Sequence, residues 1–93
     1  MRTIRRTTRF KRDYKRETKG RQAASLETEL RRVLKLLLAD RPPSEKFRDH
    51  PLGGDWKDHR DCHIKPDLVL IYRKPDAKTL ELVRLGSHSE LSL

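Results

Sequence analysis

Apolar positions recur at helical spacing in the first half of the chain and at a spacing of two in the second half. Between residues 26 and 38, leucine and valine recur every three or four positions, which predicts a helix with one broad apolar face. Ser25 is a suitable N-cap for it, and Pro42 and Pro43 should end it. We expect this face to form the core, although such a stripe could also bind a partner. It consists of Leu26, Leu30, Val33, Leu34, Leu37 and Leu38.

A shorter helix is predicted from Thr7 or Thr8 to about Thr18. Phe10 and Tyr14 lie one helical turn apart and form a thin apolar stripe among basic side chains. Because this stripe is too narrow to make an isolated helix stable, the helix must pack against another part of the chain.

Three strands are predicted after the prolines, at about 56–64, 67–73 and 79–85, where the apolar period changes to two. The continuous apolar run at 68–72 predicts a central strand that is covered on both faces. Residues 2–6 could add an edge strand. The predicted fold class is therefore α+β, with two N-terminal helices packed on a small, mainly antiparallel sheet.

Length and composition indicate one domain over residues 1–93, with little surplus stability, so that a stabilising partner is expected. Cys62 is the single cysteine, which excludes an internal disulfide and favours a reducing compartment. No apolar run approaches the ~20 residues of a membrane span, and no signal-peptide pattern begins the chain. We expect a cytoplasmic protein with no membrane contact.

The net charge of +9 is concentrated at the N-terminus, where residues 1–21 hold ten Lys and Arg against Asp13 and Glu17. A basic block of this density attracts polyanions and favours phosphate contacts, although the same block could simply be a solvated helix or arm. If the block binds phosphates, its basic residues are expected to contact RNA or the ribosome. Basic residues beside the histidine segment are expected to do the same. The residues expected to make these contacts are Lys11, Arg12, Lys15, Arg16, Lys57 and Arg60.

The second half of the chain combines histidine with aspartate. Because side chains alternate along a strand, His59, Asp61 and His63 are expected on one face of the strand 56–64. A tight turn after it would bring Asp67 beside His63. The opposite face is expected to carry Arg60, Cys62 and Ile64.

Such a cluster suits RNA cleavage by proton transfer. Histidine can both accept and donate a proton near neutral pH, and arginine can hold phosphate oxygens while it stays charged. His59, Cys62 and His63 also offer zinc-ligand atoms, but no second pair at finger-like spacing exists, so we expect no metal. From spacing alone, a ribonuclease is one candidate among several.

Several ordered motifs resemble the core of YafQ-type toxins in the RelE superfamily. They are DHPLGGDWK at 49–57, RDCHIKPD at 60–67, LIY at 70–72 and the tail RLGSHSEL at 84–91, which is similar to the family's closing pattern R-x-G-[ST]-H. The detailed resemblance covers about residues 47–91. Before that segment only the two-helix layout corresponds.

This resemblance implies an mRNA interferase that enters the ribosomal A site, cuts the message without a metal or other cofactor, and so inhibits translation and growth. It also implies an antitoxin of the DinJ kind, in a heterotetramer or larger complex. Arg84 would face the scissile phosphate. The sequence does not reveal which histidine is base and which is acid, and our own provisional assignment is His50 or His63 as base and His88 as acid. The family's functional positions fall on His50, His63, Asp67 and His88, with Asp61 in support.

Ser92 stands where relatives commonly carry a phenylalanine that helps to position RNA, so activity or codon preference should differ.

Two other functions stay open: a ParE-like binding toxin that poisons DNA gyrase without cutting RNA, and a ribosome- or nucleic-acid-binding protein without activity. The histidine cluster favours the ribonuclease, because a binding poison needs no converging imidazoles.

Overall fold

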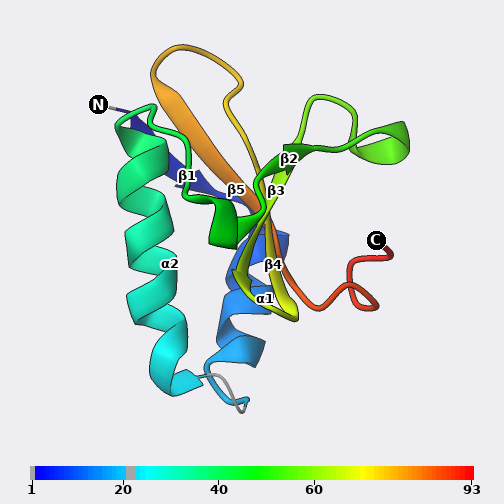
Figure 1. The fold of residues 1–93 in the computed structure, drawn as a ribbon. Coiled ribbons are helices and arrows are strands. Elements are labelled where there is room, and N and C mark those ends of the chain that lie inside the picture. The colour runs from blue at the N-terminus through cyan, green and yellow to red at the C-terminus, as the bar shows by residue number, and fades with distance from the viewer. Residues whose placement is uncertain (1, 21–22) are drawn as a thin grey trace.

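The computed structural model describes residues 2–20 and 23–93, which form two helices and a five-stranded sheet (Figure 1). In the sheet order β1-β5-β4-β3-β2, β1 is parallel to β5 and the other pairs are antiparallel. This arrangement confirms the predicted α+β class and the edge strand near the N-terminus. The elements are β1 (Thr3–Arg6), α1 (Thr8–Glu17), α2 (Ala23–Leu38), β2 (His50–Pro51), β3 (Arg60–Lys65), β4 (Leu68–Arg73) and β5 (Thr79–Gly86), with short 3-10 helices at Glu45–Phe47 and Gly54–Trp56.

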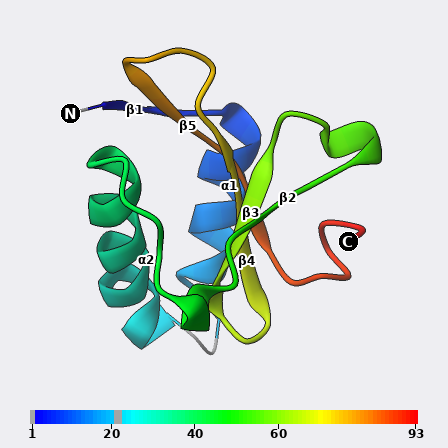
Figure 2. The same ribbon diagram turned by 45° about the horizontal axis from the view of Figure 1, so that its top comes forward.

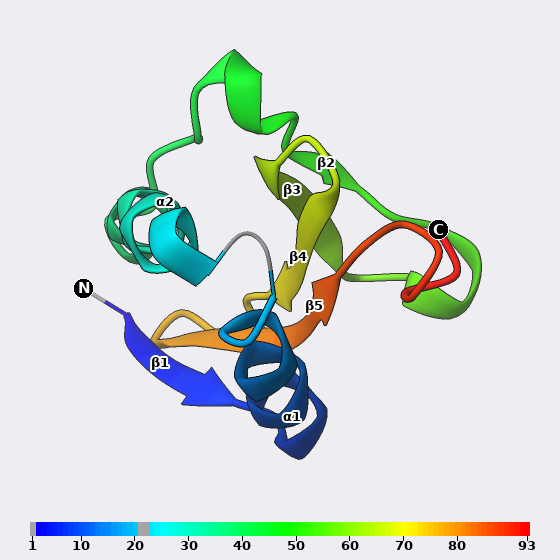
Figure 3. The same cartoon turned by 90° about the horizontal axis from the view of Figure 1, so that it is seen from below.

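The sheet separates two apolar clusters. On one side, the predicted face of α2 packs on the sheet, and Leu26, Val33 and Leu37 are at most 2% exposed. On the other side, Figure 3 shows the C-terminal segment and the 51–59 loop, and there Leu91 covers β4. Residues 68–72 of β4 are all buried, which confirms the central strand.

Helix α1 packs beside β5, as its thin apolar stripe required. Thr7 is its N-cap: its hydroxyl oxygen accepts the Phe10 N–H at 3.0 Å and donates to the Val83 carbonyl at 2.8 Å. Phe10 is 2% exposed and joins the main cluster with Tyr14. Of the N-terminal basic block, Met1 and Arg21 lie outside the described residues.

Helix α2 begins earlier than predicted. It starts at Ala23, which places Ser25 in its first turn, so the prediction of Ser25 as N-cap is wrong. Ala23 and Ala24 are strong helix formers and extend the helix toward the N-terminus. At the other end, α2 stops at Leu38, ahead of the prolines.

The strand predicted at 56–64 is wrong in its first four residues, because β3 begins only at Arg60. A turn precedes it, in which the His59 N–H donates to the Trp56 carbonyl at 2.9 Å and Asp58 takes a left-handed φ of 69°. His59 is therefore not on β3, and its ring lies edge-on to Trp56 at 5.4 Å between ring centroids.

No helix among the described residues has the length and apolarity to span a membrane.

Candidate active site

Three histidines from different parts of the chain meet on the sheet face opposite α2. The ring centroid of His63 on β3 lies 5.0 Å from that of His88 in the turn after β5 and 6.4 Å from that of His50 on β2. The short strand β2 makes this possible, because it pairs His50 with Asp61, two residues before His63. Cys62, which lies between Asp61 and His63 on β3, belongs to the main core. Because side chains alternate along a strand, Asp61 and His63 share the other face, as predicted.

Asp61 and the backbone of Arg48 hold the ring of His50. Its Nδ1 atom lies 2.9 Å from the Arg48 carbonyl oxygen and 3.0 Å from Asp61 Oδ1. A carbonyl oxygen only accepts, so this contact requires a proton on Nδ1 and leaves Nε2 of the neutral ring available as an acceptor. Asp61 is 2% exposed, and its Oδ1 lies at ion-pair distance but accepts no hydrogen bond within the described chain.

The electrostatics of this face favour a neutral His63. Burial raises the pKa of Asp61, and the charges of His50, His63 and His88 counteract that rise. Burial lowers the pKa of His63 below its ordinary value of 6.5; the Asp61 charge opposes this shift, and the charges of His88, Arg48 and His50 add to it. At neutral pH His63 is therefore suited to accept a proton.

His88, the nearer of the two neighbours of His63, lies beside a carboxylate. Its Nδ1 atom is 3.4 Å from Oδ1 of Asp67, which lies in the turn between β3 and β4. The Asp67 side chain is 72% exposed, so water screens the pair. A doubly protonated His88 can form an ion pair with Asp67 and retain a second N–H to donate.

Arg84 has a carboxylate partner of its own in helix α1. Its Nε and Nη2 atoms lie 2.7 Å and 3.3 Å from the two carboxylate oxygens of Asp13, which is 3% exposed. Burial opposes ionisation of Asp13, yet hydrogen bonds from Arg84 and the Leu85 N–H, with the charges of Arg84 and Arg16, hold its pKa below the ordinary value. The positive charge of Arg84 is thus largely matched within the protein.

Arg48 is the site residue that the sequence reasoning missed. It takes a left-handed conformation (φ 46°), contacts His50 through its carbonyl, and lines a cavity of about 400 Å³ together with His63. Lys46 and Lys65 also line that cavity. The sequence could have indicated Arg48 only as a basic residue two positions before His50. The position of Arg48 beside His63 depends on the turn at Phe47.

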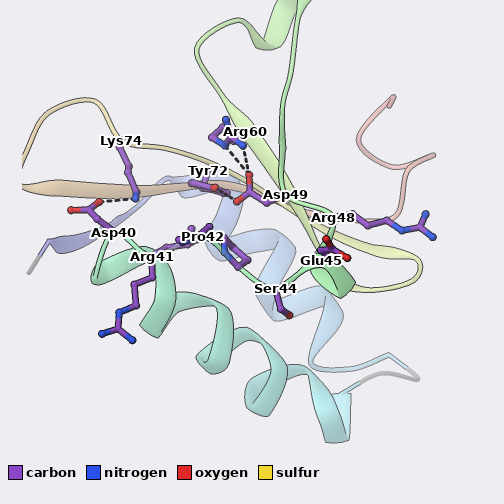
Figure 4. A pocket seen from close by; sticks show the side chains of 12 residues that line it. Asp40, Arg41, Pro42, Ser44, Glu45, Arg48, Asp49, Arg60, Tyr72 and Lys74 are labelled. Atoms are coloured by element: carbon purple, nitrogen blue, oxygen red, sulfur yellow. Dashed lines mark hydrogen bonds and ion pairs between the residues drawn. The ribbon is translucent and has the colours of Figure 1, made fainter.

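A second cavity, of about 540 Å³, lies between the end of α2 and β3–β4 and contains none of the histidines (Figure 4). In it, Asp49 accepts hydrogen bonds from Arg60 Nε at 2.7 Å and from the Tyr72 hydroxyl. Figure 4 shows the Arg48 side chain pointing away from this cavity. These contacts hold Asp49, the residue before His50, in place. They also pair Arg60, which we expected to contact RNA, with a carboxylate of the protein itself.

The predicted RNA contacts divide into two groups. Within residues 2–20 and 23–93, the side chains of Lys11, Arg12, Lys15 and Lys57 are exposed and take part in no ion pair. Arg16 instead pairs with acidic groups on α1 and in the C-terminal turn.

Residues 2–20 and 23–93 contain no cluster of three or more His, Cys, Asp or Glu side chains arranged to hold a metal ion.

Comparison with known proteins gives consistent matches. The family model described as a bacterial toxin of type II toxin-antitoxin system, YafQ, matches residues 2–93. A 45-residue stretch is 49% identical to the mRNA interferase toxin YafQ of Escherichia coli K12 and covers 48% of either chain. A 60-residue stretch is 45% identical to the putative toxin YafQ of Haemophilus influenzae and covers 61% of this chain and 59% of that one. The matches thus span about half of these relatives' lengths.

Solved structures match over nearly the full length. A copper-bound mutant toxin from Helicobacter pylori aligns with a TM-score of 0.87 and 36% identity, over 98% of this chain and 99% of that one. The DinJ–YafQ complex of E. coli contains a chain that aligns with a TM-score of 0.84 and 33% identity, over 98% of each chain. A metal-bound toxin from H. pylori aligns with a TM-score of 0.83 and 44% identity, over 98% and 99%.

Proposed function

The chain belongs to the YafQ family of toxins from bacterial type II toxin-antitoxin systems, and from this premise we propose that it is an mRNA interferase. It would cut messenger RNA in the ribosomal A site by general acid–base chemistry without a metal. The observation that carries this proposal is the row of three imidazoles, His50, His63 and His88, beside the buried Asp61. Such a row supplies a proton acceptor and a proton donor on two sides of one phosphate.

In the proposed reaction, neutral His63 takes the proton of the ribose 2′-hydroxyl as its oxygen attacks phosphorus. The bond from phosphorus to the 5′-oxygen breaks, and protonated His88 gives its proton to that leaving oxygen. The products are a 2′,3′-cyclic phosphate and a 5′-hydroxyl. His50, whose Nδ1 is held by Arg48 and Asp61, orients the 2′-hydroxyl through Nε2.

Positive charge must balance the charge that develops on the phosphate oxygens in the transition state. We assign this role to Arg48 and Arg84. Because Asp13 offsets the charge of Arg84, Arg48 beside His63 makes the larger contribution. Two toxins of this fold from H. pylori are described as metal-bound, one of them with copper, but no step proposed for this chain uses a metal.

The proposed partners are the ribosome with its message and a cognate antitoxin. Lys11, Arg12 and Lys15 of α1, together with Lys57, are exposed and suit ribosomal RNA. The solved complexes of a related toxin with DinJ support an antitoxin of that kind, in a heterotetramer or larger assembly. A ribosomal substrate would also place the protein in the cytoplasm.

Translation in a purified system, followed by primer extension on the message, tests the proposal. The protein should produce discrete cuts inside codons, and His88→Ala should remove them. An extract that stops translating with intact message would contradict the ribonuclease. Inhibition of DNA supercoiling by gyrase, measured beside it, would instead support the ParE-like alternative.

A further inference from the structure

Helix α1 is joined by side chains to the turn that carries His88. Arg16 Nε lies 3.2 Å from Oε2 of Glu90, and Arg16 Nη2 donates to the Leu85 carbonyl oxygen at 3.0 Å. These contacts connect α1 both to the end of β5 and to the C-terminal turn, which Figures 1 and 2 place beyond the end of β5. We call Arg16 and Glu90, with the contacts between them, the clamp.

Glu90 also closes the turn itself. Its Oε1 atom accepts the Ser87 N–H at 2.8 Å, and its own N–H donates to the Ser87 hydroxyl at 3.1 Å. His88 lies between the two residues of this reciprocal pair. The same carboxylate therefore shapes the turn through one oxygen and holds it against α1 through the other.

The buried carboxylate of Asp13 anchors the helix end of the clamp. Its Oδ1 atom lies 3.1 Å from Arg16 Nη1, and its Oδ2 atom accepts the Leu85 N–H at 3.0 Å. The Arg16 guanidinium thus contacts Asp13, the Leu85 carbonyl and Glu90, and its Nε also donates to Glu17 Oε2 at 3.0 Å.

Gly86 provides the space in which the clamp lies. A Cβ atom at this residue would lie 3.0 Å from Arg16 Nη2 and 3.2 Å from Glu90 Oε1, closer than ordinary van der Waals contact. A side chain at this position, two residues before His88, would therefore push the ends of both clamp side chains away from the backbone.

We propose that Arg16 and Glu90 are positioning residues that fix the imidazole of His88 against His63 and Asp67. The inference rests on the proposed function for what His88 does there, and it gives Arg16 a role other than contact with RNA. The clamp side chains are 43% and 41% exposed, so their ion pair contributes little to stability. Its effect is on geometry, because a displacement of about 1 Å in a reacting group can cost ~10²-fold in rate.

The test compares Arg16→Gln and Glu90→Gln, singly and together, with Arg9→Gln as the matched control on the exposed side of α1. The ring signals of His88 are followed by NMR through a pH titration, and single-turnover cleavage of ribosome-bound message is measured at saturating protein. Thermal melting checks that each variant is folded. The NMR measurement needs no cleavage, so it separates failure of this inference from failure of the proposed function.

Each single substitution should move the His88 ring signals and slow cleavage by about 10- to 100-fold. The double variant should be no worse than the more damaging single one, because both changes open the same clamp. Arg9→Gln should leave the His88 signals in place. Should Arg16→Gln fail to fold, the exposed Glu90→Gln still decides the question.

Unchanged His88 signals in Glu90→Gln would overturn the inference, as would single-variant effects on the rate that multiply in the double variant. Gly86→Ala gives an independent check. Its methyl group should displace the clamp and move the His88 signals in a folded protein, and signals identical to those of the unsubstituted protein would contradict the role assigned to the glycine.

Discussion

His63 lies close to two other imidazoles, and the proposed reaction divides the proton transfers between it and His88. His63→Ala and His88→Ala should each lower single-turnover cleavage by ~10²- to 10⁴-fold and relieve growth arrest. Both side chains lie outside the two apolar clusters, so the fold should remain. His59→Ala is the matched control, because this ring contacts Trp56 away from the cluster. A folded double variant with normal toxicity would remove the catalytic assignment.

The pH dependence of cleavage should report the charges around His63. Because its pKa lies below 6.5 and the neutral form acts as base, the rate should fall on the acidic side of that value. Arg48→Gln removes a charge that lowers this pKa and should move the acidic limb to higher pH. Asp61→Asn removes a charge that raises it and should move the limb to lower pH. Shifts in the same direction in both variants would contradict the assignment of His63 as base.

Single residues were predictable where the local pattern decided their position. Alternation along a strand was sufficient to place Asp61 and His63 together, and the roles of His50 and His88 came from the resemblance to the YafQ family. Arg48 was not predictable, since its place depends on a left-handed residue and a turn. The pairing of Asp13 with Arg84 joins residues 71 positions apart, and no periodicity carries that information.

At the scale of elements, α2 supplies the main core, and its leucines differ in burial. Leu26 is 1% exposed, whereas Leu34 is only partly buried. Leu26→Ala should therefore lower the free energy of unfolding by about 2 to 5 kcal/mol, and Leu34→Ala should cost less. Leu36→Ala on the same helix, outside both clusters, should cost under about 1 kcal/mol. Chemical denaturation measures all three, and equal losses would show that the core face is misplaced.

Helix α1 has two functions in this account, and a substitution series can separate them. Lys11, Arg12 and Lys15 are exposed, and changing all three to Gln should weaken ribosome binding and flatten its salt dependence by up to about one unit of slope per lost phosphate contact. Arg16 is excluded because it belongs to the clamp. Cleavage at saturating protein should survive. Cosedimentation across a salt series measures this, and an unchanged slope would remove the docking role.

Both helices and β5 were predicted from their hydrophobic periods, and β4 was predicted from its continuous apolar run. Strand β2 was missed because two residues are too short to show a period, and its only evidence is pairing with β3. The segment 56–59 was assigned to the strand that was predicted to continue to residue 64. A turn occupies it instead, with Asp58 left-handed, and such backbone geometry is not visible in polarity.

As a whole molecule, the protein is a small domain whose +9 charge can hold an RNA backbone but whose 5% aromatic content offers few rings for stacking bases. Ser92, where the resemblance to the family leads us to expect a phenylalanine, offers no ring at the C-terminal turn. A flexible strand must therefore be ordered by something else, and the proposed ribosomal site would provide that order. We expect cleavage of free RNA to be weak beside cleavage of ribosome-bound message at matched salt.

The chemistry of the cut ends distinguishes attack by the ribose 2′-hydroxyl from other routes of RNA cleavage. Purified protein is incubated with ribosomes that carry a defined message, and the new ends are identified by their reactivity toward kinase and phosphatase. General acid–base cleavage by His63 and His88 predicts a 5′-hydroxyl on one fragment and a 2′,3′-cyclic phosphate on the other. A 5′-phosphate beside a free 3′-hydroxyl would rule out the proposed reaction, because attack by the 2′-hydroxyl cannot produce those ends.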